Sequence, residues 1–421
     1  MIGLSPLLIT FVAAFGIRSA LEVVLNRLNV SHLRRYGQRI PPVFRSVVDE
    51  GKLARISAYR VESMSFGLFA DLFSQSWLLA ALLSGFLPRL VERIEPWVTN
   101  PVWEGLIFFA VLSAVLNLPR IPFNFYEIFV IEERHGFNTR TIRTWLLDLL
   151  KETLLSALLG GIVLLSLLIL IYRIRQAWWI WAWLVLALVE GLVLWLYPVL
   201  IAPWFNRFEP VSDASLQQRI QDLVEVAGLT VKGVYQMDAG KRTRHTNAYF
   251  TGLGRTKRIV LFDSLLERHT EDEILAILCH EVGHWKRKHM IKQLLALEIA
   301  SFVVLFVTGR LIQWPLLYRT FGFHGLLPFV GVFLVGTVVE LAGYFLYPLG
   351  SAISRTLERQ ADDEASRLMG TGLPLARALR RLALDNLANL NPHPLYAWFY
   401  YTHPPVVERI ERLERNERET S

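Results

Sequence analysis

Long apolar segments dominate this sequence and restrict what the chain can fold into. About seven of them fall near 3–26, 66–88, 104–130, 145–171, 178–202, 290–312 and 325–349. A membrane-spanning helix needs about 20 mostly apolar residues. Hydrophobic residues make up 53% and charged residues 19% of the 421 positions, which is more apolar surface than a soluble core would bury. We therefore predict a mainly α-helical polytopic membrane protein.

The positive charge of the chain has a pattern typical of membrane proteins. The formal net charge is +7, but the basic residues gather in short stretches beside apolar runs, as at Arg34, Arg35 and Arg39. Cytoplasmic loops of membrane proteins carry such clusters. We therefore expect membrane lipid around the protein and no nucleic acid partner. The first apolar run continues past Arg18 and Glu22, so we interpret it as a retained membrane helix and not as a signal peptide.

The spans divide the chain into four parts. We predict a transmembrane region with five spans at 1–202, a soluble part at 203–289, two further spans at 290–349 and a second soluble part at 350–421. In the first soluble part the patterns predict strands at Val231–Met237 and Arg258–Phe262 and helices at Ser215–Ala227 and Glu271–His289. Thr270 and Glu273 fit a capping box at the start of the second helix.

Several predicted spans carry polar or ionisable side chains. These are Asp71, Gln75, Glu190, Glu298 and Glu340. Because such groups are costly when they face lipid, we expect them to face one another or a wet interior. The alternative for any one of them is a simple hydrogen bond between two helices.

Residues 280–284, His-Glu-Val-Gly-His, form the motif HExxH. On a helix, the spacing of four residues puts His280 and His284 on one face, about one turn apart, where both imidazoles can bind one ion. Glu281 projects from a neighbouring position and can reach a water that the metal activates. The motif therefore predicts a catalytic Zn²⁺ site with one open position and with Glu281 as the general base.

A third metal ligand must come from another part of the chain. Arg287 and Met290 stand where the pattern HExxHxxGxxH would need Gly and His, so that pattern is excluded. We interpret His289 as a solvated residue at the membrane interface. Farther along, Glu358 and Asp362 share a helix face, so the glutamate can bind metal while the aspartate orients a ligand histidine. Alone, such a pair is usually a solvated helix face, and the upstream HExxH is what favours the ligand interpretation.

The order of the spans tests this assignment. Ligands at 280–284 and at Glu358 must meet on one side of the membrane, which requires an even number of spans between them. The two spans at 290–312 and 325–349 satisfy that requirement. The basic loop 27–60 precedes the second span and so lies on the same side as both soluble parts, which the positive-inside rule makes cytoplasmic.

Further segments, together with the HExxH helix, resemble one family over most of the chain. They are 129–138 (FVIEERHGFN), 197–205 (YPVLIAPWF), 245–250 (HTNAYF), 259–263 (IVLFD), 280–285, 358–362 and 402–405 (THPP). In these segments the chain resembles the type I CAAX prenyl proteases, which are integral-membrane zinc metalloproteases of the gluzincin clan. Eukaryotic members carry a long polar insertion before the HExxH helix, whereas here Leu266 leads directly to His280. This difference indicates a prokaryotic member.

The resemblance implies a fold and further site residues. It implies seven transmembrane helices around a large water-filled chamber, capped by a zincin-like α+β metalloprotease domain. It also implies that Asn247 and Ala248 hold the substrate backbone as an added strand. His403 would donate a hydrogen bond to the oxyanion that develops on the scissile carbonyl.

The function we predict is zinc-dependent endoproteolysis of CAAX-type prenylated peptides or of other membrane-associated peptides. An alternative is a general quality-control metalloprotease for membrane proteins, with no CAAX role. A third hypothesis, from another class, is a transporter or scaffold with an inert HExxH. The expected location is the plasma membrane of a bacterium or archaeon, or the endoplasmic reticulum membrane in a eukaryote, with the zinc domain cytoplasmic.

Overall fold

Seven helices within the described residues are long and apolar enough to cross a membrane. The computed structural model describes residues 5–174, 176–252 and 257–420. The spanning helices are α1 (Pro6–Tyr36), α2 (Glu50–Leu83), the run of α4 (Pro101–Asn117), α5 (Ile121–Tyr126) and α6 (Glu133–His135), then α7 (Ile142–Arg173), the run of α8 (Trp178–Leu196) and α9 (Ala202–Phe205), then α13 (His289–Leu311) and α15 (Pro328–Met369). Each predicted span overlaps one of them, which confirms the polytopic helical prediction.

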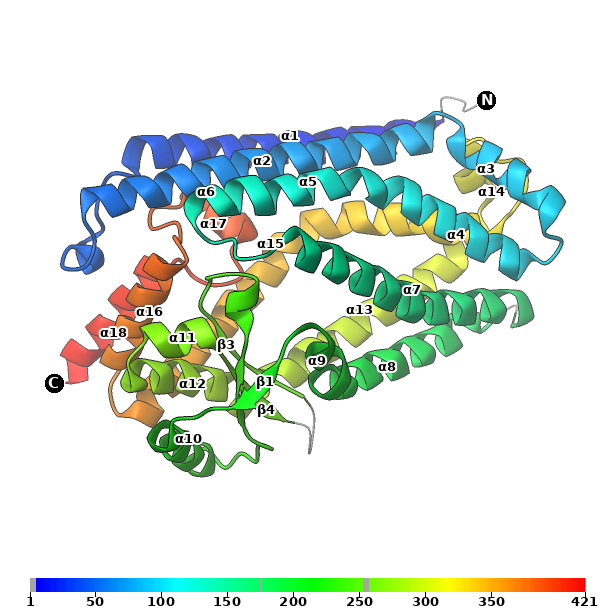
Figure 1. The fold of residues 1–421 in the computed structure, drawn as a ribbon. Coiled ribbons are helices and arrows are strands. Elements are labelled where there is room, and N and C mark those ends of the chain that lie inside the picture. The colour runs from blue at the N-terminus through cyan, green and yellow to red at the C-terminus, as the bar shows by residue number, and fades with distance from the viewer. Residues whose placement is uncertain (1–4, 175, 253–256, 421) are drawn as a thin grey trace.

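The spanning helices form a ring. Along the chain, α1 packs on α2, α2 on α4, α4 on α7, α7 on α8, α8 on α13 and α13 on α15, and α15 returns to α1. Figure 1 shows α1 and α2 along one side of this ring and α7, α8 and α13 along the other. The short helices α3 (Phe86–Ile94) and α14 (Pro315–Thr320) lie together at the end that is far from the soluble part.

Polar side chains line hollows inside the ring. One hollow of about 550 Å³ is lined by residues of α1, α2 and α15, among them Arg18, Glu22, Asp71, Gln75 and Glu340. An adjoining hollow of about 250 Å³ shares Glu22 and Asp71. Three of the intramembrane polar residues named from the sequence therefore face a common interior. Glu190 and Glu298 face each other between α8 and α13 instead.

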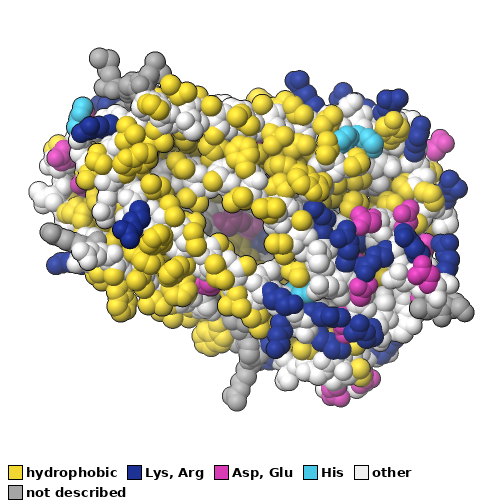
Figure 2. All heavy atoms as spheres, turned by 180° about the vertical axis from the view of Figure 1, so that it is seen from behind, with side chains coloured by type: hydrophobic (Ala, Val, Ile, Leu, Met, Phe, Trp, Pro, Cys, Tyr) yellow, Lys and Arg dark blue, Asp and Glu magenta, His cyan; other side chains and the backbone are white. Residues whose placement is uncertain are grey.

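The surface divides into an apolar half and a charged half. Figure 2 shows hydrophobic side chains over the half that the spanning helices build, whereas Lys, Arg, Asp and Glu side chains gather over the other half. A hollow opens in the apolar half on this face, and acidic side chains are visible in its depth. This distribution fits a lipid-facing belt around a polar chamber.

The soluble part combines a small mixed sheet with short helices. Its elements are β1 (Phe208–Pro210), α10 (Ala214–Val226), β2 (Val234–Met237), β3 (Ala248–Thr251), β4 (Arg258–Phe262), α11 (Asp263–Arg268), α12 (Glu271–Lys286), α16 (Leu373–Asp385), α17 (Pro394–Tyr400) and α18 (Val406–Thr420). The strand order is β1-β2-β4-β3, with β2 and β4 parallel and the other pairs antiparallel. β3 is therefore an edge strand, in reach of a further strand.

The helix that carries HExxH begins as predicted but ends earlier. Thr270 and Glu273 form the capping box at its N-terminus. We expected this helix to reach His289, but α12 ends at Lys286 and α13 begins at His289. Between them Lys288 has a left-handed backbone, with φ 57° and ψ 34°, so the chain changes direction there. The predicted single helix is therefore wrong over its last turn.

Two helices, α12 and α15, pack closely and bring the predicted ligands together. A Cβ added to Gly283 would lie 2.9 Å from the carbonyl oxygen of Ala361 and 3.0 Å from its Cα, so only glycine allows this approach. α15 runs without a break for 42 residues, through the predicted boundary between 349 and 350. The same helix thus lines the chamber and carries Glu358 and Asp362.

Candidate metal centre

Three side chains from α12 and α15 converge at the end of the chamber. His280 Nε2 lies 3.2 Å from His284 Nε2. Glu358 Oε2 lies 3.3 Å from His280 Nε2, and Glu358 Oε1 lies 3.3 Å from His284 Nε2. One ligand atom from each of the three side chains thus lies within 4.8 Å of the others, although α13 and the span of α15 separate them in the chain.

These separations match the spacing of neighbouring ligand atoms around a tetrahedral metal. Zinc bonds of about 2.0–2.1 Å to nitrogen and oxygen place neighbouring tetrahedral ligands about 3.3–3.4 Å apart. Burial alone would lower the pKa of His280, but hydrogen bonds to Asp362 and Glu358 raise that pKa to about 9. The surrounding carboxylates therefore favour positive charge at this position, and a divalent cation would supply it. On both size and charge the residues fit a metal ion.

Asp362 lies behind the first histidine. Its Oδ1 is 2.9 Å from His280 Nδ1, which leaves Nε2 free for a metal. Arg409 of α18 in turn donates to both carboxylate oxygens of Asp362, at 2.6 and 2.9 Å. This bidentate ion pair holds the carboxylate in place, because Arg409 and Asp362 side chains are only 10% and 3% exposed.

His289 lies behind the second histidine and is not solvated. Its exposed fraction is 1%, so the interpretation of a solvated interfacial residue is wrong. His289 Nδ1 lies 3.0 Å from His284 Nδ1, and His289 Nε2 lies 3.0 Å from Gln360 Oε1. The left-handed turn at Lys288 folds His289 back onto the HExxH helix, and no sequence pattern announces that reversal.

The two predicted catalytic side chains lie beside the cluster. Glu281 is half-buried, and burial raises the pKa of its carboxyl. A raised pKa suits a general base that works near neutral pH. His403, in the loop before α18, has its Nε2 3.3 Å from Glu358 Oε1, and its side chain is 61% exposed. It therefore borders the metal-ligating atoms from the open side.

The predicted substrate residues lie at the start of the edge strand. Asn247 is exposed and Ala248 is buried. The Asn247 carbonyl accepts from Phe262 N at 3.1 Å, which joins this point of the chain to β4. Asn247 Oδ1 also accepts from Ala248 N at 2.9 Å. Its side chain thus occupies one main-chain donor on the side that an incoming strand would meet.

Comparison with known proteins covers nearly the whole chain. The family model of the CAAX prenyl protease N-terminal region, with five membrane helices, matches residues 29–207, and that of peptidase family M48 matches residues 210–417. CAAX prenyl protease 1 of Saccharomyces cerevisiae is 32% identical over 403 residues, which is 89% of this chain and 88% of the yeast protein. The chain belongs to the CAAX prenyl protease 1 family of M48 peptidases.

Further relatives agree in sequence and in fold. The CAAX prenyl protease 1 homolog of Arabidopsis thaliana is 31% identical over 390 residues, covering 90% of this chain and 92% of the plant protein. The crystal structure of S. mikatae Ste24p superposes with a TM-score of 0.90 at 28% identity, and the match covers 98% of this chain and 100% of that one. This CAAX prenyl protease family member is thus a multi-pass membrane metalloendopeptidase.

Sequence reasoning missed Arg409 and Gln360 at this M48 centre and misjudged His289. Arg409 comes six residues after His403 in the sequence, one turn into the helix that follows the HPP turn. A basic residue at that point was a usable signal, because two buried carboxylates on one helix face need a cation. Gln360 lies between Glu358 and Asp362 in sequence but points to another face of α15, so spacing alone did not select it.

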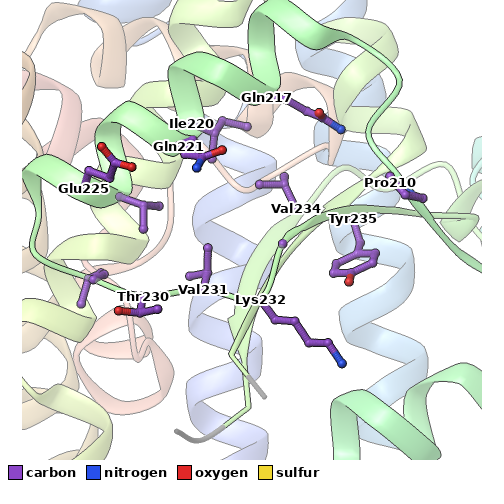
Figure 3. A pocket seen from close by; sticks show the side chains of 13 residues that line it. Pro210, Gln217, Ile220, Gln221, Glu225, Thr230, Val231, Lys232, Val234 and Tyr235 are labelled. Atoms are coloured by element: carbon purple, nitrogen blue, oxygen red, sulfur yellow. The ribbon is translucent and has the colours of Figure 1, made fainter. Parts of the chain in front are cut away.

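A groove of the soluble part lies away from the metal centre, between α10 and β2, with a volume of about 570 Å³. Figure 3 shows residues that line it, among them Ile220 and Val234, and Gln217, Glu225 and Lys232. None of the residues that line it belongs to the cluster of His280, His284 and Glu358. Its size therefore has no bearing on the peptidase chemistry.

Proposed function

We propose that the protein is a zinc-dependent endopeptidase that cleaves CAAX-type prenylated peptides, or other membrane-associated peptides, at the end of its membrane chamber. The observation that carries the proposal is the convergence of His280, His284 and Glu358, whose nearest nitrogen and oxygen atoms lie 3.2–3.3 Å apart. Relatives that match along almost the full chain are named CAAX prenyl protease 1, which supports the substrate class.

The proposed roles follow from position and chemistry. His280, His284 and Glu358 would hold Zn²⁺, which when bound lowers the pKa of a water and polarises a carbonyl. Glu281 takes the proton of the attacking water and passes it to the leaving amine. His403 donates from its ring to the carbonyl oxygen as negative charge develops there.

Supporting residues hold these groups and the substrate. Asp362 accepts from His280 Nδ1–H, which directs the lone pair of Nε2 toward the metal. Ala248 binds the substrate main chain along the free edge of β3, as an added strand. Asn247 acts there through its exposed side chain, because its carbonyl accepts from Phe262 N of β4. Main-chain pairing is tolerant of side-chain identity, so the selection of substrates would come from the chamber.

The chamber favours substrates that carry a lipid or an apolar segment. Each CH₂ group removed from water contributes about 0.8 kcal/mol, so a prenyl chain seated among the spanning helices adds several kcal/mol to binding. A folded soluble protein offers no such group, and the ring of helices obstructs its approach. The partners we propose are therefore lipidated or membrane-associated peptides together with the surrounding lipid.

We also propose that both soluble parts lie in the cytoplasm. The basic cluster at Arg34, Arg35 and Arg39 is at the end of α1 that adjoins the soluble part, as the positive-inside rule requires. The direct connection from Leu266 to the HExxH helix supports the plasma membrane of a bacterium or archaeon as the location. In a eukaryotic source the corresponding location is the endoplasmic reticulum membrane.

The test compares substrates and metal content. The purified protein in lipid vesicles should bind one zinc ion and cleave a farnesylated CAAX peptide faster than the same peptide without the lipid. His280→Ala, His284→Ala and Glu358→Ala should lose the metal, whereas His324→Ala, in a distant exposed loop, should keep it.

Full zinc occupancy in Glu358→Ala would remove Glu358 from the site. Equal cleavage of many unlipidated membrane peptides would favour the quality-control alternative, and fast cleavage of a folded soluble protein would contradict a chamber-restricted enzyme.

A further inference from the structure

Left-handed backbone occurs at two non-glycine positions in the described part of the chain. They are Lys288, with φ 57°, and Leu387, with φ 44°. Such a conformation costs about 1–2 kcal/mol for a residue with a side chain, and strain of this kind collects at functional sites. Lys288 directly precedes His289, and Leu387 directly follows Asn386. Both neighbours contact the peptidase site.

The edge strand β3 directs alternate residues toward its free side. In an antiparallel pair, one residue turns its N–H and C=O to the partner strand and the next turns them away. The Asn247 carbonyl accepts from Phe262 N of β4. Asn247 therefore faces β4, and Thr246, Ala248 and Phe250 turn their main-chain groups toward the free edge. An added peptide strand would pair with those three residues.

At Ala248 the N–H already donates to Asn247 Oδ1, and at Thr246 a side chain takes both main-chain groups. Asn386 Oδ1 accepts from Thr246 N at 3.1 Å, and Asn386 Nδ2 donates to Thr246 O at 3.2 Å. The amide thus makes both hydrogen bonds that a residue of an added strand would make. Among the described residues no such partner meets the outer main-chain groups of Phe250 or the carbonyl of Ala248.

The Asn386 amide is held firmly in this position. His245 Nδ1 lies 3.0 Å from the same Oδ1. Arg60 of α2 donates to the carbonyls of Asn386 and Leu387, at 3.2 and 2.7 Å. The membrane ring therefore fixes the strained turn at Leu387, which in turn fixes the amide against Thr246.

We propose that Asn386 closes one end of the substrate groove and so limits how far a peptide extends on one side of the cleaved bond. This inference rests on the proposed function, with β3 as the substrate strand. A peptide residue paired with Ala248 can be followed by about one more residue before the next meets the Asn386 amide, since strand pairing repeats every two residues. Asn386 is thus a specificity-determining residue that selects cleavage near a chain end.

The test varies peptide length on each side of the cleaved bond. One farnesylated CAAX peptide is compared with versions that carry five extra residues at the N-terminus or at the C-terminus. The wild-type protein should tolerate one extension and lose about tenfold or more in kcat/KM for the other, the equivalent of one lost hydrogen bond. Asn386→Ala and Asn386→Ser should remove most of that difference. Asn391→Ala, in the same loop, should leave it unchanged.

Each outcome has a distinct meaning. If wild type cleaves no peptide, the proposed function fails. If wild type cleaves but neither extension slows it, or if both Asn386 variants keep the wild-type length dependence, the closure of the groove is contradicted. Asn386 variants that keep metal but lose activity on every peptide alike would make Asn386 a support of β3 and would also overturn the proposal. Metal content and elution volume check the fold of each variant.

A second observation independently concerns the metal centre. If His284 binds metal through Nε2, its Nδ1 carries the proton and donates to His289 Nδ1, 3.0 Å away. His289 then carries its own proton on Nε2, which donates to Gln360 Oε1 at 3.0 Å. His284, His289 and Gln360 thus have one consistent assignment of donors and acceptors. In this assignment the lone pair of His284 Nε2 points to the metal.

The geometry assigns His289 as a positioning residue that acts through His284, as Asp362 does through His280. Partners of this kind contribute about 10- to 100-fold in metal affinity. The measurement is zinc affinity by chelator competition, which needs no turnover. His289→Leu should weaken zinc binding by about 10- to 100-fold, and His289→Asn, whose Oδ1 can accept from His284, should recover most of it.

Two further variants complete this test. Gln360→Met removes the acceptor that sets the tautomer of His289, so it should weaken zinc binding in the same direction, while His324→Asn in an exposed loop should have no effect. Wild-type zinc affinity in both His289→Leu and Gln360→Met would overturn the assignment. Equal losses in His289→Leu and His289→Asn would reduce His289 to a packing residue and would also contradict it.

Discussion

At the scale of single residues, each predicted ligand histidine depends on what its second ring nitrogen contacts. His280 Nδ1 lies against Asp362, which Arg409 holds through two hydrogen bonds. His284 Nδ1 lies against His289. A buried ion pair such as Asp362 and Arg409 costs about 3–5 kcal/mol when one partner is removed. The shape of the cluster therefore depends on residues outside the predicted ligand set.

Glu281→Gln should keep zinc and lose turnover. The amide has the shape of the carboxylate but cannot take a proton from the attacking water, so kcat should fall by about 10²- to 10⁴-fold. Metal analysis and peptide cleavage on the same preparation measure both effects. Glu271→Gln, at the partly exposed start of the same helix, serves as the control. A pure and active Glu281→Gln protein would refute Glu281 as the base.

His403→Ala should lower kcat while zinc stays bound. His403 borders the cluster from the open side without belonging to the predicted ligand set. Loss of a hydrogen bond to the developing oxyanion costs about 10²-fold or more in kcat. Steady-state kinetics with metal analysis test this, with His324→Ala as the matched control. Unchanged kinetics would leave His403 a structural role only.

The metal-binding role of a residue could be predicted from the sequence where spacing within one helix determines which side chains share a face. The structure brings together His280, His284 and Glu358, as expected, because i, i+4 spacing and ligand chemistry are local properties. His289 was misjudged and Asn386 was missed because both act through left-handed turns, at Lys288 and Leu387. The tertiary contacts around those residues impose these turns, against local preference.

At the scale of elements, the contact between α12 and α15 determines whether the ligands meet. Gly283 lies inside the HExxH motif at a point where a Cβ would be 2.9 Å from the backbone of Ala361. Two helix axes that approach this closely leave no room for a larger residue. The two helices could be predicted from the sequence, but their contact could not. A glycine within a helix does not indicate which element packs against it.

Gly283→Ala should separate α12 from α15 and weaken the metal centre. We expect a loss of about 1–3 kcal/mol in stability, with lower zinc occupancy, because Glu358 moves with α15. Gly350→Ala is the control, since a Cβ there meets nothing within 4 Å and alanine favours helix. Thermal unfolding and metal analysis compare the two variants. Equal stability and zinc content in both would show that the close approach is not essential.

At the scale of the whole molecule, the two soluble parts form one body on one side of the ring. The predicted ligands on α12 and α15 meet although α13 and the span of α15 lie between them in sequence. The even number of spans could be counted from the sequence. The closure of the ring and the depth of its polar interior could not be predicted from the sequence, because they depend on how seven similar apolar helices pack.

Both soluble parts should be labelled from the cytoplasmic side. With Cys279→Ala as background, single cysteines at Ser215 and Arg415 should react with an impermeant reagent in vesicles that expose the cytoplasmic face. A cysteine at Trp97, 87% exposed between α3 and α4, should react only from the opposite face. Opposite sidedness of positions 215 and 415 would break both the topology and the metal centre.

The continuity of α15 gives the membrane a mechanical connection to the chemistry. Its 42 residues include Pro348, where a helix bends, but no loop separates the span from Glu358. Bilayers of unmatched thickness tilt spanning helices, and tilt would shift the carboxylate relative to α12. We therefore expect peptidase rates to peak at one acyl-chain length in reconstituted vesicles and to fall on either side, so that lipid thickness acts as a regulator of this enzyme.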